Sequence, residues 1–501
     1  MKKQLRGVLI AAAVLVVFAV VYFVLLAVLG KGNEPTGNTS SEPPASDVSS
    51  TPSEEPTLHL YEYDVDTFVS AEITTLAGDV YHVERRDDAF TIPELAGFSC
   101  YLSNIRLCAE RLCAYSYYEK VTDSATPEEL EEYGFSSPRG KATVTFTDGK
   151  TLTVLVGGQT EEGLSYFKRQ DDDTVVLTTT GITSYFLKGK VNFLKSELFS
   201  CAEERRKGID KLEFIDAQSE YPVKISKTDG DRASALAISS TYYLTYPTTM
   251  GVDSEALDTG LTDLSHFSGE GVIEILDETT DLAVYGLDAP RYTLSFTYQK
   301  PLADDDTSET NPNPIESYKF YISDADELGT CYVYAEGGKT VSYFTKEGYS
   351  FMTWTLEKLA GSTFLSPMIK TLERMNVRTG GRDYTFYFTE GDGSISAVRY
   401  EDRQLDVDNF KKFYQVVLGT GWIDLGRKEE GAAPLLEISF VYRADYGKVP
   451  DTMIFYPFSL RQYAVEVNGE GAFTVPKTRV DKVIGDLNKV IRNEPVTAFL
   501  N

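Results

Sequence analysis

Histidine and cysteine are scarce in this chain of 501 residues, which contains three histidines and five cysteines. The histidines, His59, His82 and His266, share no ligand spacing with one another or with a cysteine, so we expect no zinc site. So few histidines also leave little general base for a serine or cysteine nucleophile. The odd cysteine count and the lack of paired spacing argue against a disulfide framework. The sequence therefore predicts no metal, no cofactor and no catalytic residues of these classes.

Basic residues are the minority charge, with 48 lysines and arginines against 76 aspartates and glutamates, a formal net charge of −28. This field repels nucleic acid, so we expect no nucleic-acid partner. Phosphate-binding glycine loops and nucleophile elbows are also missing from the sequence. Acidic clusters such as Asp171–Asp173 fit no twelve-residue calcium loop, and we interpret them as solvated turns.

One long apolar run is present at residues 7–29, which carry no charge. As a helix this run spans about 34 Å, enough to cross a hydrocarbon core of about 30 Å. Lys2, Lys3 and Arg6 precede it, so residues 1–6 are expected in the cytoplasm and the rest of the chain outside the cell membrane. A cleaved secretory signal is the alternative, but Ala27-Val28-Leu29 places leucine where a small residue is needed. The sequence predicts a single uncleaved transmembrane helix.

Residues 30–57 are rich in serine, threonine and proline and nearly free of aliphatic side chains. Such a composition predicts a disordered stalk that acts as a spacer. The remainder, residues 58–501, is more than one hydrophobic core usually organises, so several units are expected.

A short motif occurs twice, as YGFSSPRG at residues 133–140 and as YGLDAPRY at residues 285–292. Each copy lies between a helical pattern and a strand pattern, where glycine can end the helix and proline prevents it from resuming. The shared residues are Tyr133, Gly134, Pro138 and Arg139 in the first copy and Tyr285, Gly286, Pro290 and Arg291 in the second. We interpret all eight as a structural motif. The two arginines could alternatively bind an anionic ligand, but their repetition favours a helix-capping role.

Alternating strand patterns and helical patterns recur around the motif, with helices expected at Tyr101–Tyr118 and Val407–Leu418 and a hairpin turn at Asp148-Gly149. The sequence therefore predicts an α+β fold, made of three tandem units of mainly antiparallel β-hairpins with interspersed helices and preceded by the transmembrane helix. The expected units are residues 58–205, 206–368 and 369–501.

The order of strand pair, helix, Y-G-[FL]-x-x-P-R motif and hairpins resembles the bacterial domain of unknown function 4340 family. The third unit lacks the Tyr-Gly pair and the arginine, so it resembles the family by pattern alone. Proteins of this kind have one N-terminal anchor and are often encoded beside ABC-type transporter components. The resemblance implies a topology and a partner, a membrane protein complex, but no established activity.

Three functions are compatible with these patterns. The first is a non-enzymatic binding or accessory protein, tethered by residues 7–29 and associated with an ABC-type transporter complex. The second is a cell-wall glycan-binding protein, which would present exposed members of the 32 tyrosines. The third is an envelope hydrolase, which would need two carboxylates about 5–10 Å apart. The sequence favours the first.

Overall fold

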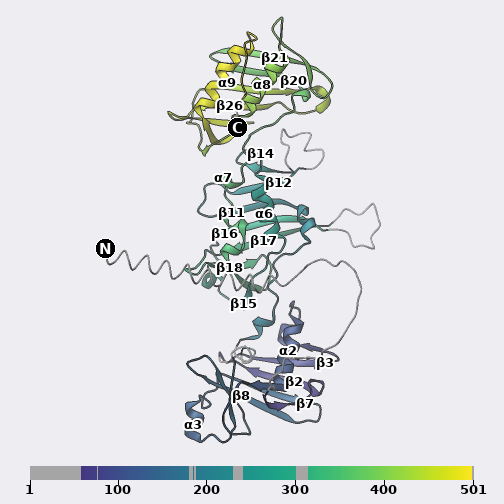
Figure 1. The fold of residues 1–501 in the computed structure, drawn as a ribbon, viewed down its shortest axis with the longest axis vertical. Coiled ribbons are helices and arrows are strands. Elements are labelled where there is room, and N and C mark those ends of the chain that lie inside the picture. The colour runs from purple at the N-terminus through teal and green to yellow at the C-terminus, as the bar shows by residue number, and fades with distance from the viewer. Residues whose placement is uncertain are drawn as a thin grey trace, which may run out of the picture. The chain divides into compact units, whose positions relative to one another are not determined.

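The structure is a computed structural model that describes residues 58–75, 77–179, 184, 188–228, 241–300 and 314–498. The expected transmembrane helix at residues 7–29 and the stalk at residues 30–57 lie outside these described residues. Within them, no helix is both long and apolar enough to span a membrane. The fold is α+β, and the strand pairs are antiparallel (Figure 1).

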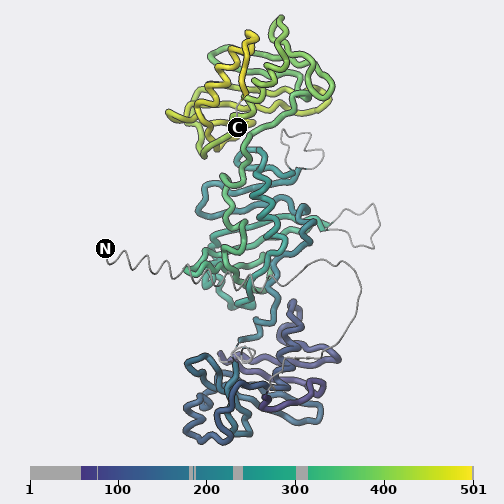
Figure 2. The backbone as a smooth tube through the Cα atoms, viewed as in Figure 1, coloured from purple at the N-terminus to yellow at the C-terminus, as the bar shows by residue number. Residues whose placement is uncertain are grey.

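Three large antiparallel sheets follow one another along the chain (Figure 2). The first has eight strands in the order β4 (Ala89–Thr91), β3 (Val80–Arg86), β2 (Phe68–Thr74), β7 (Gly140–Phe146), β8 (Thr151–Gln159), β9 (Ser165–Arg169), β10 (Val175–Thr178) and β6 (Glu119–Thr122). The second has nine, in the order β14 (Met250–Gly251), β13 (Tyr242–Tyr246), β12 (Val223–Lys227), β11 (Ile209–Asp216), β16 (Tyr292–Gln299), β17 (Ile315–Ile322), β18 (Thr330–Ala335), β19 (Thr340–Thr345) and β15 (Gly271–Ile275). The third also has nine, in the order β23 (Arg403–Leu405), β22 (Ile395–Tyr400), β21 (Arg382–Glu390), β20 (Leu372–Thr379), β25 (Leu436–Tyr442), β26 (Asp451–Pro457), β27 (Gln462–Val467), β28 (Glu470–Pro476) and β24 (Asp424–Leu425).

The second and third sheets have the same strand order, and the first sheet has that order without its outermost strand. The second sheet ends on β14 and the third on β23, whereas the first sheet ends one strand earlier, on β4. At this point of the first sheet the chain instead runs through residues 92–101, which contain the 3-10 helix η2 (Pro93–Leu95). The first sheet therefore differs from the others at one edge.

In each sheet the first strands are followed along the chain by an amphipathic helix, and the remaining strands come after it. These helices are α2 (Leu102–Cys113), α6 (Ser254–Leu264) and α8 (Val407–Leu418). In α8, Phe410, Phe413, Tyr414 and Val417 are buried, a spacing of three and four residues that gathers them on one face. Asp406 caps this helix by accepting a hydrogen bond from the Asn409 amide at 2.6 Å. Helices α8 and α9 (Lys477–Val490) cover one face of the third sheet (Figure 1). The shorter helices are α3 (Pro127–Glu132) and α7 (Leu356–Leu359).

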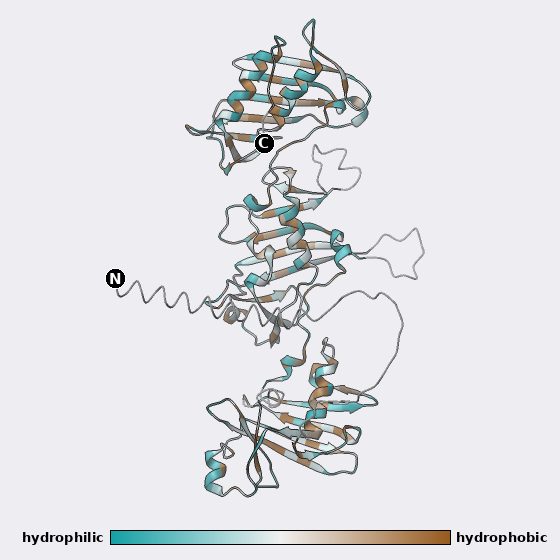
Figure 3. Ribbon diagram, viewed as in Figure 1, coloured by the Kyte–Doolittle hydropathy of each residue, from teal (hydrophilic) through white to brown (hydrophobic). Residues whose placement is uncertain are grey.

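Buried and exposed side chains alternate along the strands, so hydrophobic and hydrophilic residues alternate in Figure 3. In β25, Leu436, Ile438, Phe440 and Tyr442 point to the core while the residues between them are partly exposed. Burying each such aliphatic or aromatic side chain stabilises the fold by about 1.5–3 kcal/mol. Phe440→Ala would therefore cost several times a typical surface change, about 3–5 kcal/mol.

One expected helix is shorter in the structure. The pattern at Tyr101–Tyr118 predicts a single helix, but α2 ends at Cys113 and the next residues form β5 (Ala114–Tyr117). Strand β5 pairs with β1 (Leu58–Glu62) in a separate two-stranded sheet. The backbone groups of residues 114–117 thus bond to a distant strand, which local periodicity cannot reveal. By contrast, α8 has the bounds expected from the sequence.

Candidate functional site

Both glycines of the repeated motif have left-handed backbone angles, with φ of +81° at Gly134 and +64° at Gly286. Gly134 follows α3, whose start is fixed by a capping box between Thr126 and Glu129. The Tyr133 carbonyl accepts a hydrogen bond from the Gly158 amide at 2.7 Å. A Cβ on Gly134 would lie 2.7 Å from the same amide nitrogen, so only glycine fits here without movement. The motif thus joins the end of α3 to β8.

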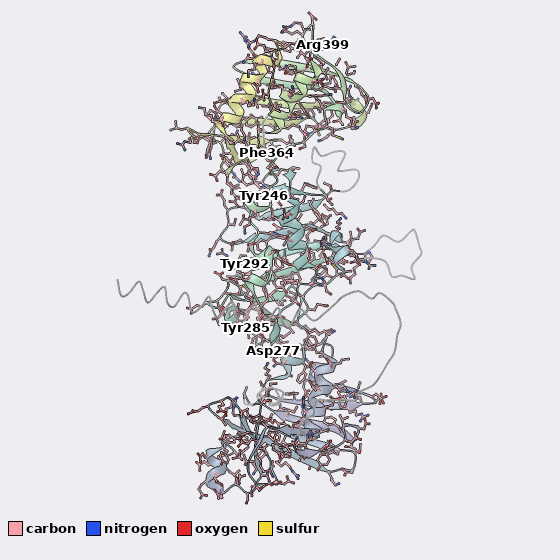
Figure 4. All side chains as sticks on the ribbon, in the orientation of Figure 1. Tyr246, Asp277, Tyr285, Tyr292, Phe364 and Arg399 are labelled. Atoms are coloured by element: carbon pink, nitrogen blue, oxygen red, sulfur yellow. The ribbon has the colours of Figure 1, made fainter. Side chains whose placement is uncertain are left out.

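The two motif tyrosines stack on the hairpin that comes later in each sheet. Tyr133 packs on Tyr166 of β9, with ring centroids 4.6 Å apart, and Tyr285 contacts Tyr332 of β18 edge-on at 5.3 Å. The Tyr285 hydroxyl also donates to Glu274 at 3.1 Å. Figure 4 labels Tyr285 and Tyr292, which mark the two ends of the second copy of the motif. These aromatic contacts hold the turn against the sheet.

The two motif arginines have different surroundings. Arg291 pairs with Asp216: its Nη2 donates to Oδ2 at 3.0 Å, and its Nε lies 2.8 Å from Oδ1 without the alignment of a hydrogen bond. In the second sheet Asp216 pairs with Tyr292, the residue after the motif arginine. Extending the β2–β7 register one residue beyond the pair Thr74–Lys141 places Thr75 at the equivalent position of the first sheet. Arg139 Nη1 and Thr75 Oγ1 are both buried, and neither has a hydrogen-bond partner among the described residues. The prolines, Pro138 and Pro290, directly precede these arginines.

Beside α2 lies a cavity of about 510 Å³ that we call the α2 groove. Residues 92–100 provide much of its lining, and they belong to the segment that connects β4 to α2 where the other two sheets have one more strand. Most of its lining is apolar, and Leu102 at the start of α2 is 64% exposed beside it. Its lining residues are Arg86, Thr91, Ile92, Pro93, Leu95, Ala96, Gly97, Phe98, Ser99, Cys100, Leu102, Ile105 and Lys195. The cavity has the size of a ligand-binding cleft, about 300–1,000 Å³.

The polar atoms of the α2 groove are few and distinctive. Its two charged residues are both cations: Arg86 pairs with Glu84 at 2.9 Å, whereas Lys195 has no ion pair with the described part of the chain. The Thr91 hydroxyl is buried and makes no hydrogen bond within the described residues. Burial raises the pKa of the Cys100 thiol, so this side chain stays protonated and weakly nucleophilic near neutral pH.

An ion pair attaches the wall of the groove to the sheet. His82 of β3 lies 2.6 Å from Glu94 of η2, between Nδ1 and Oε1, and 3.5 Å from Glu72. The hydrogen bond with Glu94 raises the pKa of His82. Burial alone would raise the pKa of Glu94, but the hydrogen bonds from the ring and backbone of His82 outweigh it and lower this pKa. Each partner therefore favours the charged form of the other.

A second cavity, of about 540 Å³, adjoins a buried ion pair in the third sheet. Lys448 Nζ lies 2.6 Å from Asp451 Oδ2, and both side chains are more than nine-tenths buried. Lys448 neutralises this carboxylate, and Tyr442 and Asn468 donate further hydrogen bonds to it. No group of three or more histidine, cysteine or acidic side chains that could hold a metal occurs among the residues described.

Sequence reasoning identified the motif but not the groove. The eight motif residues lie at the two helix-to-strand turns described above and do not line the α2 groove. One signal was available: the connection before α2 is longer than the connections before α6 and α8. In the sequence His82 has no evident partner, because Glu94 belongs to a segment without a strand or helix pattern.

Comparison with protein families supports the resemblance that the motif suggested. The family described as "Domain of unknown function (DUF4340)" matches residues 102–290, which run from the first residue of α2 to the proline of the second motif. The comparisons with curated proteins and with solved structures gave no match. The matched segment contains the first copy of the motif whole and the second as far as Pro290, and over this segment the chain is similar to the DUF4340 family.

Proposed function

We propose that this protein is a membrane-anchored, extracytoplasmic binding protein without catalytic activity, which docks onto a membrane protein complex through the α2 groove. Residues 7–29 are its anchor, and components of an ABC-type transporter are its expected partner, by resemblance to the family. The observation that carries the proposal is the groove itself: an apolar cavity with an exposed leucine, beside the edge where the first sheet lacks the outermost strand of the other two.

The missing strand of the first sheet is informative because the same strand order recurs in the other two sheets. Tandem repeats conserve the elements that form their cores, while their binding surfaces arise from changes in connecting segments. Here the strand orders agree from sheet to sheet except at the edge where the first sheet lacks a strand, and residues 92–101 form the connecting segment at that edge. An exposed Leu102 beside buried Ile92 and Ile105 gains free energy when a partner covers it, about 25 cal/mol for each Å² removed from water.

Tethering makes a weak contact sufficient. A predicted spacer of the length of residues 30–57 has a root-mean-square reach of about 30 Å. Anchored partners in the same membrane then meet at a high effective concentration, so a small groove can sustain an association that would be too weak in solution. The groove also lies in the first sheet after this spacer in sequence.

The test is photocrosslinking in intact cells from a photoreactive amino acid placed at Leu102 of the full chain. The matched control is Leu328, which is 87% exposed and lies in a turn of the second sheet. We expect position 102, and not position 328, to give an adduct with an integral membrane protein, and Leu102→Asp to remove co-purification of that protein. Equal labelling at both positions, or hydrolysis of purified cell-wall material by the full chain, would contradict the proposal.

A further inference from the structure

We infer that the α2 groove binds an extended apolar peptide segment of a partner protein, and that an acidic side chain of this segment pairs with Lys195. The inference rests on the proposed binding function and specifies the chemistry of the partner. Three features of the groove carry it: its place in the sheet, its apolar lining and its charge.

The place of the groove favours an extended peptide. In the second sheet β14 pairs with β13 through Leu244 and Met250, and in the third sheet β23 pairs with β22 through Val398 and Leu405. The first sheet stops at β4, where Thr91 pairs with Glu84 of β3. The scaffold thus accommodates one more extended segment at this position. A partner segment that takes this place reproduces, between two chains, a contact that the other two sheets make within one.

The lining of the groove favours aliphatic or aromatic side chains. Ile92, Leu95 and Ile105 are at most 4% exposed and form its apolar surface, while Leu102 stands at its rim. A volume of about 510 Å³ holds a few side chains, not a whole helix. The buried Thr91 hydroxyl, unpaired among the described residues, offers a hydrogen bond to a peptide N–H or C=O group. An acyl chain would leave this hydroxyl without a partner.

The charge of the groove favours an acidic peptide. Acids outnumber bases by 76 to 48 in the chain, yet both charged residues that line the groove are basic. Arg86 is already neutralised by Glu84, which leaves Lys195 as the cation available to a ligand. A carboxylate beside the apolar residues of the peptide would pair with it. The acidic surface elsewhere repels such a peptide, so the preference is local to the groove.

The experiment measures peptide binding to the full chain in phosphatidylcholine nanodiscs by fluorescence anisotropy. The probes are three labelled octapeptides with one Leu-Ile-Val-Phe core, flanked by glutamate, glutamine or lysine. We expect the glutamate peptide to bind at least tenfold more tightly than the lysine peptide. Lys195→Glu should reverse this order of affinity, and Leu102→Asp should weaken binding of the glutamate peptide at least tenfold. The matched controls are Lys412→Glu, an exposed lysine on α8, and Leu328→Asp, which should change nothing.

Three results would overturn the inference: equal binding of the glutamate and lysine peptides, full binding by Leu102→Asp, or binding of oleate with no binding of any peptide. These results are separable from a failure of the proposed function. If crosslinks from position 102 to a membrane protein persist while the peptide preference is missing, the binding function stands and the acidic apolar peptide is wrong. If the crosslinks are also missing, both are wrong.

Discussion

Gly134 shows how a single residue constrains the first sheet. Its left-handed backbone, with φ of +81°, would cost an alanine about 1 kcal/mol by itself. The added Cβ would also lie 2.7 Å from the Gly158 nitrogen, a backbone atom held in a hydrogen bond to Tyr133. We therefore expect Gly134→Ala to lower the unfolding free energy of this sheet by clearly more than 1 kcal/mol, measured by native-state hydrogen exchange at the amides of β8.

Gly149 supplies the matched control for this change. It has a similar φ of +78°, but a Cβ built on it would meet no atom within 4 Å. Gly149→Ala should therefore cost only the backbone strain. Equal losses in the two variants would show that the clash with Gly158 is relieved and that strain alone decides the effect.

Arg139 is the second residue that yields a prediction, because its surroundings differ from those of Arg291. Its counterpart Arg291 has a carboxylate partner in Asp216, whereas the strand register gives Thr75 as the counterpart of Asp216 in the first sheet. A buried guanidinium nitrogen without a partner is unfavourable, and a hydrogen bond to a charged group contributes about 1.5–3 kcal/mol. We expect Thr75→Asp to stabilise the first sheet and Asp216→Thr to destabilise the second by about 2 kcal/mol. Thermal unfolding of the full chain measures both, with slower hydrogen exchange in β2 expected for Thr75→Asp.

An isosteric change separates charge from shape at this position. Thr75→Asn has nearly the size of aspartate but no charge, so it should gain much less than Thr75→Asp. If both variants lose stability equally, the space beside Arg139 does not accept the larger side chain, and the proposed equivalence of Thr75 and Asp216 fails.

Among the elements, η2 has an attachment to the sheet whose stability depends on pH, because it includes the ion pair of His82 and Glu94. The folded-state pKa of His82 is raised above its usual value near 6.5, so its contribution is complete below that value and is lost as pH rises through the raised pKa. The pKa of Glu94 is lowered from its usual value near 4.3, so its contribution is complete above that value and is lost as pH falls through the lowered pKa. Both contributions are complete between about pH 4.3 and 6.5.

We therefore expect the loss of stability caused by replacing His82 to be largest at mildly acidic pH. The melting temperature of the first sheet should fall most on His82→Gln near pH 5.5, and the difference should shrink toward pH 9 and toward pH 3. Because His82 is 43% exposed, the effect should stay below about 1 kcal/mol. His59→Gln is the control, since this histidine lies near the Ser116 hydroxyl at 3.4 Å and has no ion pair with another described residue. A difference independent of pH would exclude the ion pair as its cause.

Elements with a strong local pattern were predictable from the sequence, and those fixed by distant partners were not. The hairpin at Asp148-Gly149 and helix α8 follow from turn chemistry and apolar spacing, and both are present. Strand β5 and the end of α2 depend on pairing with β1, which lies more than fifty residues earlier. The α2 groove depends on a strand that the first sheet lacks, and a missing element has no pattern of its own. The difference between Arg139, whose Nη1 has no hydrogen-bond partner among the described residues, and Arg291 likewise emerges only when the registers of two sheets are compared.

At the scale of the whole molecule, the three sheets share one strand order, which the first sheet follows without its outermost strand, but the helices packed on them have different neighbours. In the second sheet α6 packs around Trp354, whose ring leaves no room for a side chain at Gly260. In the third sheet α8 packs on α9. In the first sheet α2 packs near η3 (Lys190–Phe193) and borders the groove. The repeated topology supplies a stable framework, and the element added beside each helix gives each sheet its own surface.

The whole-molecule prediction concerns the anchor. Residues 7–29 form an uncharged apolar run, and each leucine, isoleucine, phenylalanine or valine near its centre favours insertion by about 0.3–0.6 kcal/mol. We expect the full chain to stay with the membrane after washes in high salt and alkaline carbonate, and to be released by detergent. A variant without residues 2–29 should be recovered in the soluble fraction, since the acidic remainder has little attraction for anionic headgroups. N-terminal sequencing of the membrane-bound protein should begin before residue 7. A start beyond Ala27, or release of the full chain by salt alone, would show that the run is a cleaved signal or a peripheral contact and would remove the tether on which the proposed docking relies.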